Sequence, residues 1–222
     1  MRKLFFENKK KFILGITACV SFILFLILLG ICGSMSASLD AQSMAERWSE
    51  KGGVAQVSCF FSPNAGITTD RLQEFEYSLD SALQEASIEP ESENPGARLW
   101  ADAYSAEGKI MLSSDKSGVD ADAIGIGGDF FLFHPLKLIS GAYFSGNDIN
   151  KDYCIIDQDA AWQLFGSNDV AGMVVYIAGR PHIVTGVIER EGGRMAKAAG
   201  LDGTRVYVSY ETLNQYGVCN GI

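Results

Sequence analysis

Histidine and closely spaced cysteine are scarce in this sequence, and their scarcity restricts the chemistry that it can perform. Its 222 residues include two histidines, His134 and His182, and five cysteines without a C-x-x-C pair. Metal sites need such ligands at short spacing, so no metal centre is expected. Paired carboxylates such as Asp157 and Asp159 are better explained as helix caps and turn residues. We therefore predict no catalytic residue, no cofactor-binding residue and no enzymatic activity.

The sequence also lacks a phosphate-binding loop and, beyond its first residues, an excess of positive charge. Gly125–Gly128 does not follow the G-x-x-x-x-G-K-[ST] pattern, and Asp129 comes directly after it. The first eleven residues hold five of the 18 basic residues and one of the 27 acidic ones. The remaining 13 basic and 26 acidic residues give a net charge of −13. Such a surface repels phosphates, so nucleic acid is not an expected partner.

One long apolar run stands out against this acidic background. Residues 12–32 carry no charge, and fourteen of these 21 residues are Leu, Ile, Val or Phe. A helix of this length reaches about 31 Å, close to the hydrocarbon thickness of a bilayer. The sequence thus predicts a transmembrane helix over residues 12–32.

The charges on either side of this run predict its orientation. Residues 1–11 contain Arg2 and four lysines, whereas Asp40, Glu46 and Glu50 follow the run. The positive-inside rule keeps residues 1–11 as a cytoplasmic tail and places the bulk of the chain outside the cell (plasma or inner) membrane. The alternative is a cleaved signal peptide, but the run is longer than the apolar region of a signal peptide.

The cysteines outside the run leave their redox state open. Cys59, Cys154 and Cys219 are an odd number, so they cannot form a fully paired framework. One disulfide could form among them in an oxidising compartment. Alternatively, Cys59 and Cys154 are small apolar residues of strands, which their apolar neighbours favour.

The first part of the extracytoplasmic region predicts a stalk and one strand–helix unit. Residues 33–53 have a helical apolar stripe that ends at two glycines, which predicts a stalk helix. Residues 54–61 alternate apolar and polar positions as a strand does. Thr69 or Asp70 can cap a following helix, whose apolar positions through residue 86 should pack on that strand. Residues 87–97 contain two prolines and three glutamates, which predicts a loop or a boundary between two lobes.

The remaining sequence predicts mostly antiparallel strands with one more helix. Strands are expected at residues 98–104, 109–113, 121–127, 153–156, 173–177, 182–188 and 205–209. Asp157 should cap a short helix that ends at Gly166. Residues 173–188 should form a hairpin through residues 178–181. We therefore predict an α+β fold in which residues 54–222 form one mixed, mostly antiparallel domain with two or more packed helices.

Aromatic residues in this region are expected in the core. Trp100 and Tyr104 have the same parity on one predicted strand, and Phe130, Phe131 and Phe133 cluster shortly before Gly141. A ligand groove is the less favoured alternative for these side chains.

Three segments resemble a known family. They are FFLFHPLKLISGAYF at residues 130–144, IIDQDAAWQLFGSND at 155–169 and GMVVYIAGRPHIVTGV at 172–187. Their order is similar to that in the MacB-like periplasmic core domain of ABC transporter permeases. The family pattern falls on Gly141, Phe144, Ala161, Leu164, Phe165, Gly166, Asp169, Gly172, Val184, Gly186 and Val187. We interpret these positions as fold markers, because Gly166 and Gly172 suit positive φ and the two valines suit a sheet.

The resemblance implies a non-catalytic, membrane-anchored part of a permease that works with a separate ATPase and further permease helices. Permeases of this family have three more transmembrane helices after this domain, whereas no second apolar run of that length follows residue 32. The chain is therefore expected to be either a truncated permease or a single-pass relative. The alternative function is a stand-alone envelope protein whose domain binds a protein or peptide partner.

Overall fold

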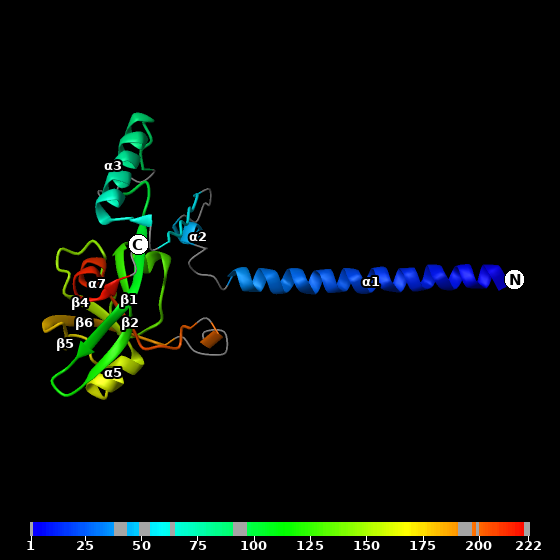
Figure 1. Cartoon of the computed structure of the whole chain (residues 1–222). Helices are drawn as coiled ribbons and strands as arrows, with labels where there is room; N and C mark the ends of the chain where they lie inside the picture. Colours follow the sequence, from blue (N-terminus) through cyan, green and yellow to red (C-terminus); the bar gives the residue numbers. More distant parts are fainter. Residues whose placement is uncertain are drawn as a thin grey trace. The chain divides into compact units, whose positions relative to one another are not determined.

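The computed structural model describes residues 2–37, 44–48, 54–62, 65–90, 97–190, 197–198 and 200–219. The chain divides into two compact units, residues 1–56 and residues 57–222. Figure 1 traces the whole chain, and each unit is described by itself.

The first unit contains the apolar run as one long helix. Helix α1 (Arg2–Ala37) has 36 residues, and its stretch Lys11–Met35 is long and apolar enough to cross a membrane. The predicted span of residues 12–32 lies inside that stretch. Helix α2 (Met44–Trp48) follows. The predicted stalk over residues 33–53 is thus helical at both described segments, while residues 38–43 and 49–53 lie outside the described residues.

Six strands of the second unit form a sheet that closes on itself. They are β1 (Ala103–Ser113), β2 (Gly118–Gly128), β4 (Tyr153–Asp157), β5 (Val174–Ile177), β6 (Arg180–Ile188) and β7 (Arg205–Ser209). Their order is β2-β7-β4-β6-β5-β1, and β1 pairs again with β2. Two short strands extend the sheet: β3 (Leu138–Gly141) pairs with β6, and β8 (Val218–Cys219) pairs with β1. Among these pairings, β2–β7 and β4–β6 are parallel and the rest are antiparallel.

Helices among the described residues of this unit accompany the sheet. They include α3 (Thr69–Glu85), α4 (Phe130–Phe133), α5 (Gln158–Phe165) and α7 (Tyr210–Tyr216). Helix α5 buries Ala160, Ala161 and Leu164, whereas α7 buries Leu213 among others. The predicted α+β class with a mostly antiparallel sheet is confirmed.

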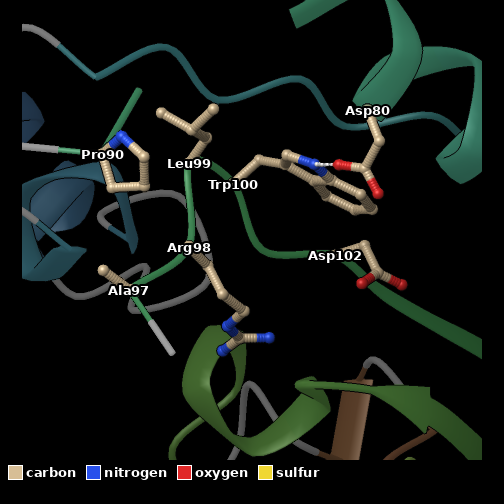
Figure 2. Close-up of a pocket in the computed structure, with 7 residues that line it drawn as sticks. All are labelled: Asp80, Pro90, Ala97, Arg98, Leu99, Trp100 and Asp102. Carbon is tan, nitrogen blue, oxygen red and sulfur yellow. Dashed lines mark hydrogen bonds between the residues drawn. The ribbon is translucent and has the colours of Figure 1, made fainter. Parts of the chain in front are cut away.

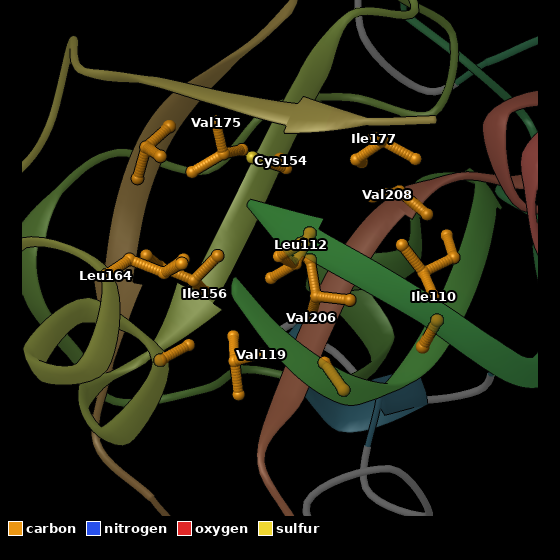
Figure 3. Packing of buried hydrophobic residues seen from close by; sticks show 14 of the residues in the cluster. Ile110, Leu112, Val119, Cys154, Ile156, Leu164, Val175, Ile177, Val206 and Val208 are labelled. Atoms are coloured by element: carbon orange, nitrogen blue, oxygen red, sulfur yellow. The ribbon is translucent and has the colours of Figure 1, made fainter. Parts of the chain in front are cut away.

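Strands β4 and β7 carry apolar residues at successive middle positions, Cys154–Ile156 and Val206–Val208, because both faces of these strands are buried. Cys154 and Ile156 of β4 belong to the larger core cluster, while Ile155 between them belongs to a second, aromatic cluster. The larger core also includes Ile110, Leu112, Val119, Leu164, Val175, Ile177, Val206 and Val208, which meet between the strands in Figure 3. Because successive strand residues point to opposite faces, such strands lose the alternating pattern of a half-exposed sheet.

The aromatic cluster lies on the other face of these strands. Phe130 and Phe131 contact Tyr207, and Phe131 also packs edge-on against Phe144 at 5.7 Å between ring centroids. The expected core position of Phe130 and Phe131 is confirmed, while Phe133 is half-buried.

The glycine-rich end of β2 has a packing role. A Cβ on Gly125 would lie 2.8 Å from a methyl carbon of Leu213, so the absence of a side chain lets α7 approach the strand. The glycines at this end of β2 are part of a β-strand, and the close packing of α7 explains the glycine at position 125.

The local prediction was correct around α5 and the β5–β6 hairpin. Asp157 caps α5, and Gly166 ends it in the left-handed conformation at φ 73°. Ala178 and Gly179, both with positive φ, form the two-residue turn between β5 and β6, as in a type I′ hairpin.

Several predictions for residues 54–104 were wrong. Residues 54–62 form no strand, and Val57 and Phe60 are 84% and 96% exposed. A strand needs a partner edge, and residues 54–62 pair with none of the strands. Helix α3 has no buried residue, so it does not pack as expected, and its cap is Thr68 instead of Thr69 or Asp70. The two strands expected at 98–104 and 109–113 are the single strand β1, which leaves residues 98–102 outside it.

Two elements and one cysteine also differ from the prediction. Helix α7 and strand β8 follow β7, where no further element was expected. Cys154 is buried on β4 as one of the two interpretations required, but Cys59 is exposed and lies on no strand. All five cysteines are free thiols in this structure.

Candidate functional site

A cavity of about 300 Å³ lies where the segment before β1 meets the second half of α3. Its lining residues are Asp80, Pro90, Ala97, Arg98, Leu99, Trp100 and Asp102, shown in Figure 2. Asp80 comes from α3, and the other residues precede β1 in the chain.

Three hydrogen bonds hold the walls of this cavity. The indole Nε1 of Trp100 donates a hydrogen bond to Asp80 Oδ1 at 2.8 Å, which ties α3 to the segment before β1. Arg98 Nη1 donates to Asp129 Oδ2 at 2.5 Å, and the same two groups form an ion pair. The backbone amide of Asp129 donates to the carbonyl of Asp102 at 2.8 Å. The cavity is therefore fixed to the start of α4 as well as to α3.

Negative charge predominates around the cavity. Burial raises the pKa of the Asp102 carboxyl, and the charge of Asp129 raises it further, while Arg98 acts in the opposite direction. Burial also raises the pKa of Glu76, followed by the charges of Asp102 and Asp80. These carboxylates repel one another because they carry like charges, and Arg98 offsets this repulsion at Asp129 and Asp102.

The lining of the cavity places the Trp100 indole beside carboxylates. An aromatic face beside carboxylates attracts cationic groups. Within the described ranges, no group of three or more His, Cys, Asp and Glu side chains is placed to hold a metal ion.

The eleven family-pattern positions lie elsewhere, in the sheet and around α5. Val184 and Val187 of β6 are fully buried with Ala161 and Leu164 of α5 in the larger core, and Phe165 packs against it. Phe144 belongs to the aromatic cluster, and Asp169 is exposed after α5. None of the eleven lines the cavity.

The glycines among these positions have specific backbone roles. The positive φ expected at Gly166 and Gly172 is found, at 73° and 87°. Gly141 also has positive φ, and a Cβ built on it would lie 2.7 Å from the Cα of Gly186, its partner across β3 and β6. The backbones of β3 and β6 can therefore lie this close together only because Gly141 and Gly186 have no side chains.

The cavity residues were not identified as a site from the sequence. Trp100 was expected on a core strand, whereas it is half-buried and lies before β1. Asp80 and Trp100 are 20 positions apart, and Arg98 and Asp129 are 31 apart. No local motif links residues at such distances, so only the less favoured ligand-groove interpretation of Trp100 pointed here.

Comparison with curated proteins finds partial relatives among macrolide exporters. One is the macrolide export ATP-binding/permease protein MacB of Chromobacterium violaceum, 29% identical over 96 residues, which cover 42% of this chain and 14% of that protein. MacB of Neisseria gonorrhoeae is 30% identical over 97 residues, 40% of this chain and 15% of that protein. The match thus spans about one seventh of the length of these relatives.

Comparison with solved structures gives a similar picture. The extracellular domain of the ABC-type transporter YknZ from Gram-positive bacteria is 23% identical with a TM-score of 0.41, covering 52% of this chain and 59% of that one. The periplasmic region of MacB from Actinobacillus actinomycetemcomitans is 20% identical with a TM-score of 0.42, covering 56% of each chain.

The family comparison extends over nearly the whole sequence. The sequence model of the MacB-like periplasmic core domain matches residues 12–219, from the apolar helix to β8. This chain therefore belongs to the MacB-like periplasmic core domain family of ABC transporter permeases.

Proposed function

We propose that the chain is a non-catalytic permease component anchored in the cell (inner or plasma) membrane. Its second unit lies on the extracytoplasmic side of that membrane. In this proposal α1 crosses the membrane once with its N-terminus inside. A separate ATPase subunit supplies the energy, and further permease helices complete the transport path.

The observation that carries the proposal is the extent of the family match. It begins at residue 12, the first residue of the predicted span, and continues through the closed sheet. The apolar helix and the folded unit therefore match as parts of one family pattern. The five basic residues before the span support the proposed orientation.

The fold supports a mechanical or binding role for the second unit. Its fully buried side chains are aliphatic with few exceptions, and its buried Asp157 is occupied with capping α5 and binding the Arg205 amide. Polar groups committed to such contacts hold the domain together and are not available to a substrate.

Cysteine labelling in spheroplasts tests the orientation of the chain in the membrane. A variant with Cys59 as its single cysteine should react with a membrane-impermeant maleimide in spheroplasts, since Cys59 is exposed. A cysteine-free variant carrying Asn8→Cys should react only after the membrane is permeabilised. A single Cys154 variant serves as the unreactive control, because that thiol is fully buried. The reverse order of reactivity of Cys59 and the cysteine at position 8 would reject the proposed topology.

Purification from native membranes tests the partners. A tagged full chain should recover an ATPase subunit with a P-loop and additional membrane-spanning polypeptide, identified by mass spectrometry. Recovery of the chain alone under mild detergent would favour the stand-alone envelope protein instead.

A further inference from the structure

Helix α3 presents an apolar face that the described residues do not bury. Leu72, Phe75, Leu79 and Leu83 follow one another at spacings of three and four residues, which places them on one side of the helix. The three leucines are half-buried, but Phe75 is 64% exposed. No residue of α3 is buried.

This exposure distinguishes α3 from α4, α5 and α7, each of which buries at least two residues. Helix α5 has 8 residues and buries three of them, whereas α3 has 17 and buries none. Most of the stability of a helix in a folded protein comes from packing of its apolar face. A partner that covers the Phe75 side would supply this packing.

The charges on α3 indicate what kind of partner fits. The helix has five carboxylates, Asp70, Glu74, Glu76, Asp80 and Glu85, against one basic residue, Arg71. At 3.6 residues per turn, Glu76 lies beside the leucines of the apolar face on one side, and Asp80 follows it about 40° further around. On the other side Arg71 lies next to Phe75, with Glu85 and Glu74 beyond it. Burial raises the pKa of Glu76, and the charges of Asp102 and Asp80 raise it further, so these neighbours add to the negative charge on this side of the helix.

We propose that α3 is a docking surface for a basic amphipathic helix of another protein. Leucines or similar side chains of the partner helix would cover Phe75. Lysines or arginines of the partner helix would face the glutamates on either side of the apolar face of α3. A second copy of this chain would bring another acidic α3 to the same place, and an anionic lipid surface would be repelled, so both fit less well.

The test uses the full chain in nanodiscs of zwitterionic phosphatidylcholine. The probe is a fluorescent synthetic helix of about 18 residues built from Leu and Lys, with a Leu/Glu peptide of the same pattern for comparison. The Leu/Lys peptide should bind, as measured by fluorescence anisotropy, and should bind more weakly at high salt. The Leu/Glu peptide should not bind.

Two variants of the same helix decide whether the face or the mere charge is responsible. Phe75→Ser should weaken binding about tenfold, as expected for a central apolar contact. Tyr77→Ser is the matched control, because Tyr77 is an aromatic residue of similar exposure, 77%, about 200° around the helix. It should leave binding unchanged, and both substitutions should preserve the circular dichroism spectrum.

Three outcomes would overturn the proposal. Equal loss in the Phe75 and Tyr77 variants, or no loss in either, would show that the peptide binds acidic charge without using the apolar face. Equal binding of the Leu/Glu peptide would remove the charge argument. Concentration-dependent dimerisation that Phe75→Ser abolishes, measured by sedimentation, would assign the face to a second copy of the chain.

Discussion

The carboxylate of Asp157 joins the start of α5 to the start of β7. Its Oδ1 accepts a hydrogen bond from the Ala160 amide at 2.7 Å, and its Oδ2 accepts one from the Arg205 amide at 2.9 Å. The side chain is 1% exposed, although Arg205 lies 48 positions along the chain. One acidic side chain therefore satisfies two backbone donors from different elements.

Replacing Asp157 should destabilise the second unit because both donors would lose their acceptor. Asp157→Ala is expected to lower the free energy of unfolding by about 3 kcal/mol, combining a lost helix cap with a second unsatisfied donor. Asp157→Asn keeps one oxygen and should lose about half as much. Urea denaturation of the full chain in mild detergent measures both. Equal stability of the alanine and asparagine variants would contradict the two-donor role.

Closure of the sheet depends on a short pairing between β1 and β5, in which Leu112 lies opposite Ile177. Both side chains are fully buried. Leu112→Ala should cost about 3 kcal/mol of unfolding free energy, from lost burial and the cavity that remains. Met111→Ala provides the adjacent control, since Met111 is 63% exposed, and should change stability by less than about 0.5 kcal/mol. Similar denaturation midpoints for the two variants would show that the closure contributes little.

Local signals explain which parts of the fold the sequence could predict. Asp157 and Gly166 mark the two ends of α5, and each acts through neighbouring backbone groups: the Asp157 side chain accepts from Ala160, and Gly166 donates to the carbonyl of Trp162. Ser209 gives a similar signal for α7, because its side chain accepts a hydrogen bond from the Thr212 amide. Helix α7 nevertheless lies beyond the last element that the sequence pattern predicts, the strand at residues 205–209.

Contacts between distant residues explain what could not be predicted. Alternation in residues 54–61 satisfied the pattern of a strand, but a pattern does not show whether a free partner edge exists. The pairing of Leu112 with Ile177 and the bond of Trp100 to Asp80 join segments 65 and 20 positions apart. Such contacts depend on the path of the whole chain, so both the ring and the cavity emerged only from the structure.

Gly166 provides a test of backbone strain without steric conflict. Its φ is 73°, and a Cβ at this position would meet no atom within 4 Å. Any cost of substitution should therefore come from the left-handed conformation itself. Gly166→Ala should lower the unfolding free energy by about 1 kcal/mol, and Gly166→Val by more, because a β-branched residue resists positive φ. Gly166→Asn is the control, since asparagine tolerates this conformation, and should cost least. From highest to lowest, the expected order of thermal melting temperatures is Gly, Asn, Ala, Val at position 166. An unchanged melting temperature for Gly166→Val would contradict the argument.

The electrostatics of the cavity predict a pH dependence that can be assigned to Asp102. Burial, and then the Asp129 charge, raises its folded-state pKa above the ordinary 3.8. The folded state then binds this proton more tightly than the unfolded state, so the free energy of unfolding falls as pH rises through and above 3.8. Above the folded-state pKa the carboxylate is charged in both states, and its destabilising effect is complete.

Asp102→Asn should remove this effect, because the amide stays neutral at every pH and also relieves the repulsion that Glu76 experiences from Asp102. The variant should therefore be more stable than the natural sequence at pH 7, and the difference should shrink as the pH approaches 3.8. Urea denaturation at several pH values measures this difference, with Asp120→Asn, an exposed carboxylate on β2, as the control. Parallel pH profiles for Asp102→Asn and the natural sequence would show that the repulsion around the cavity does not reach Asp102.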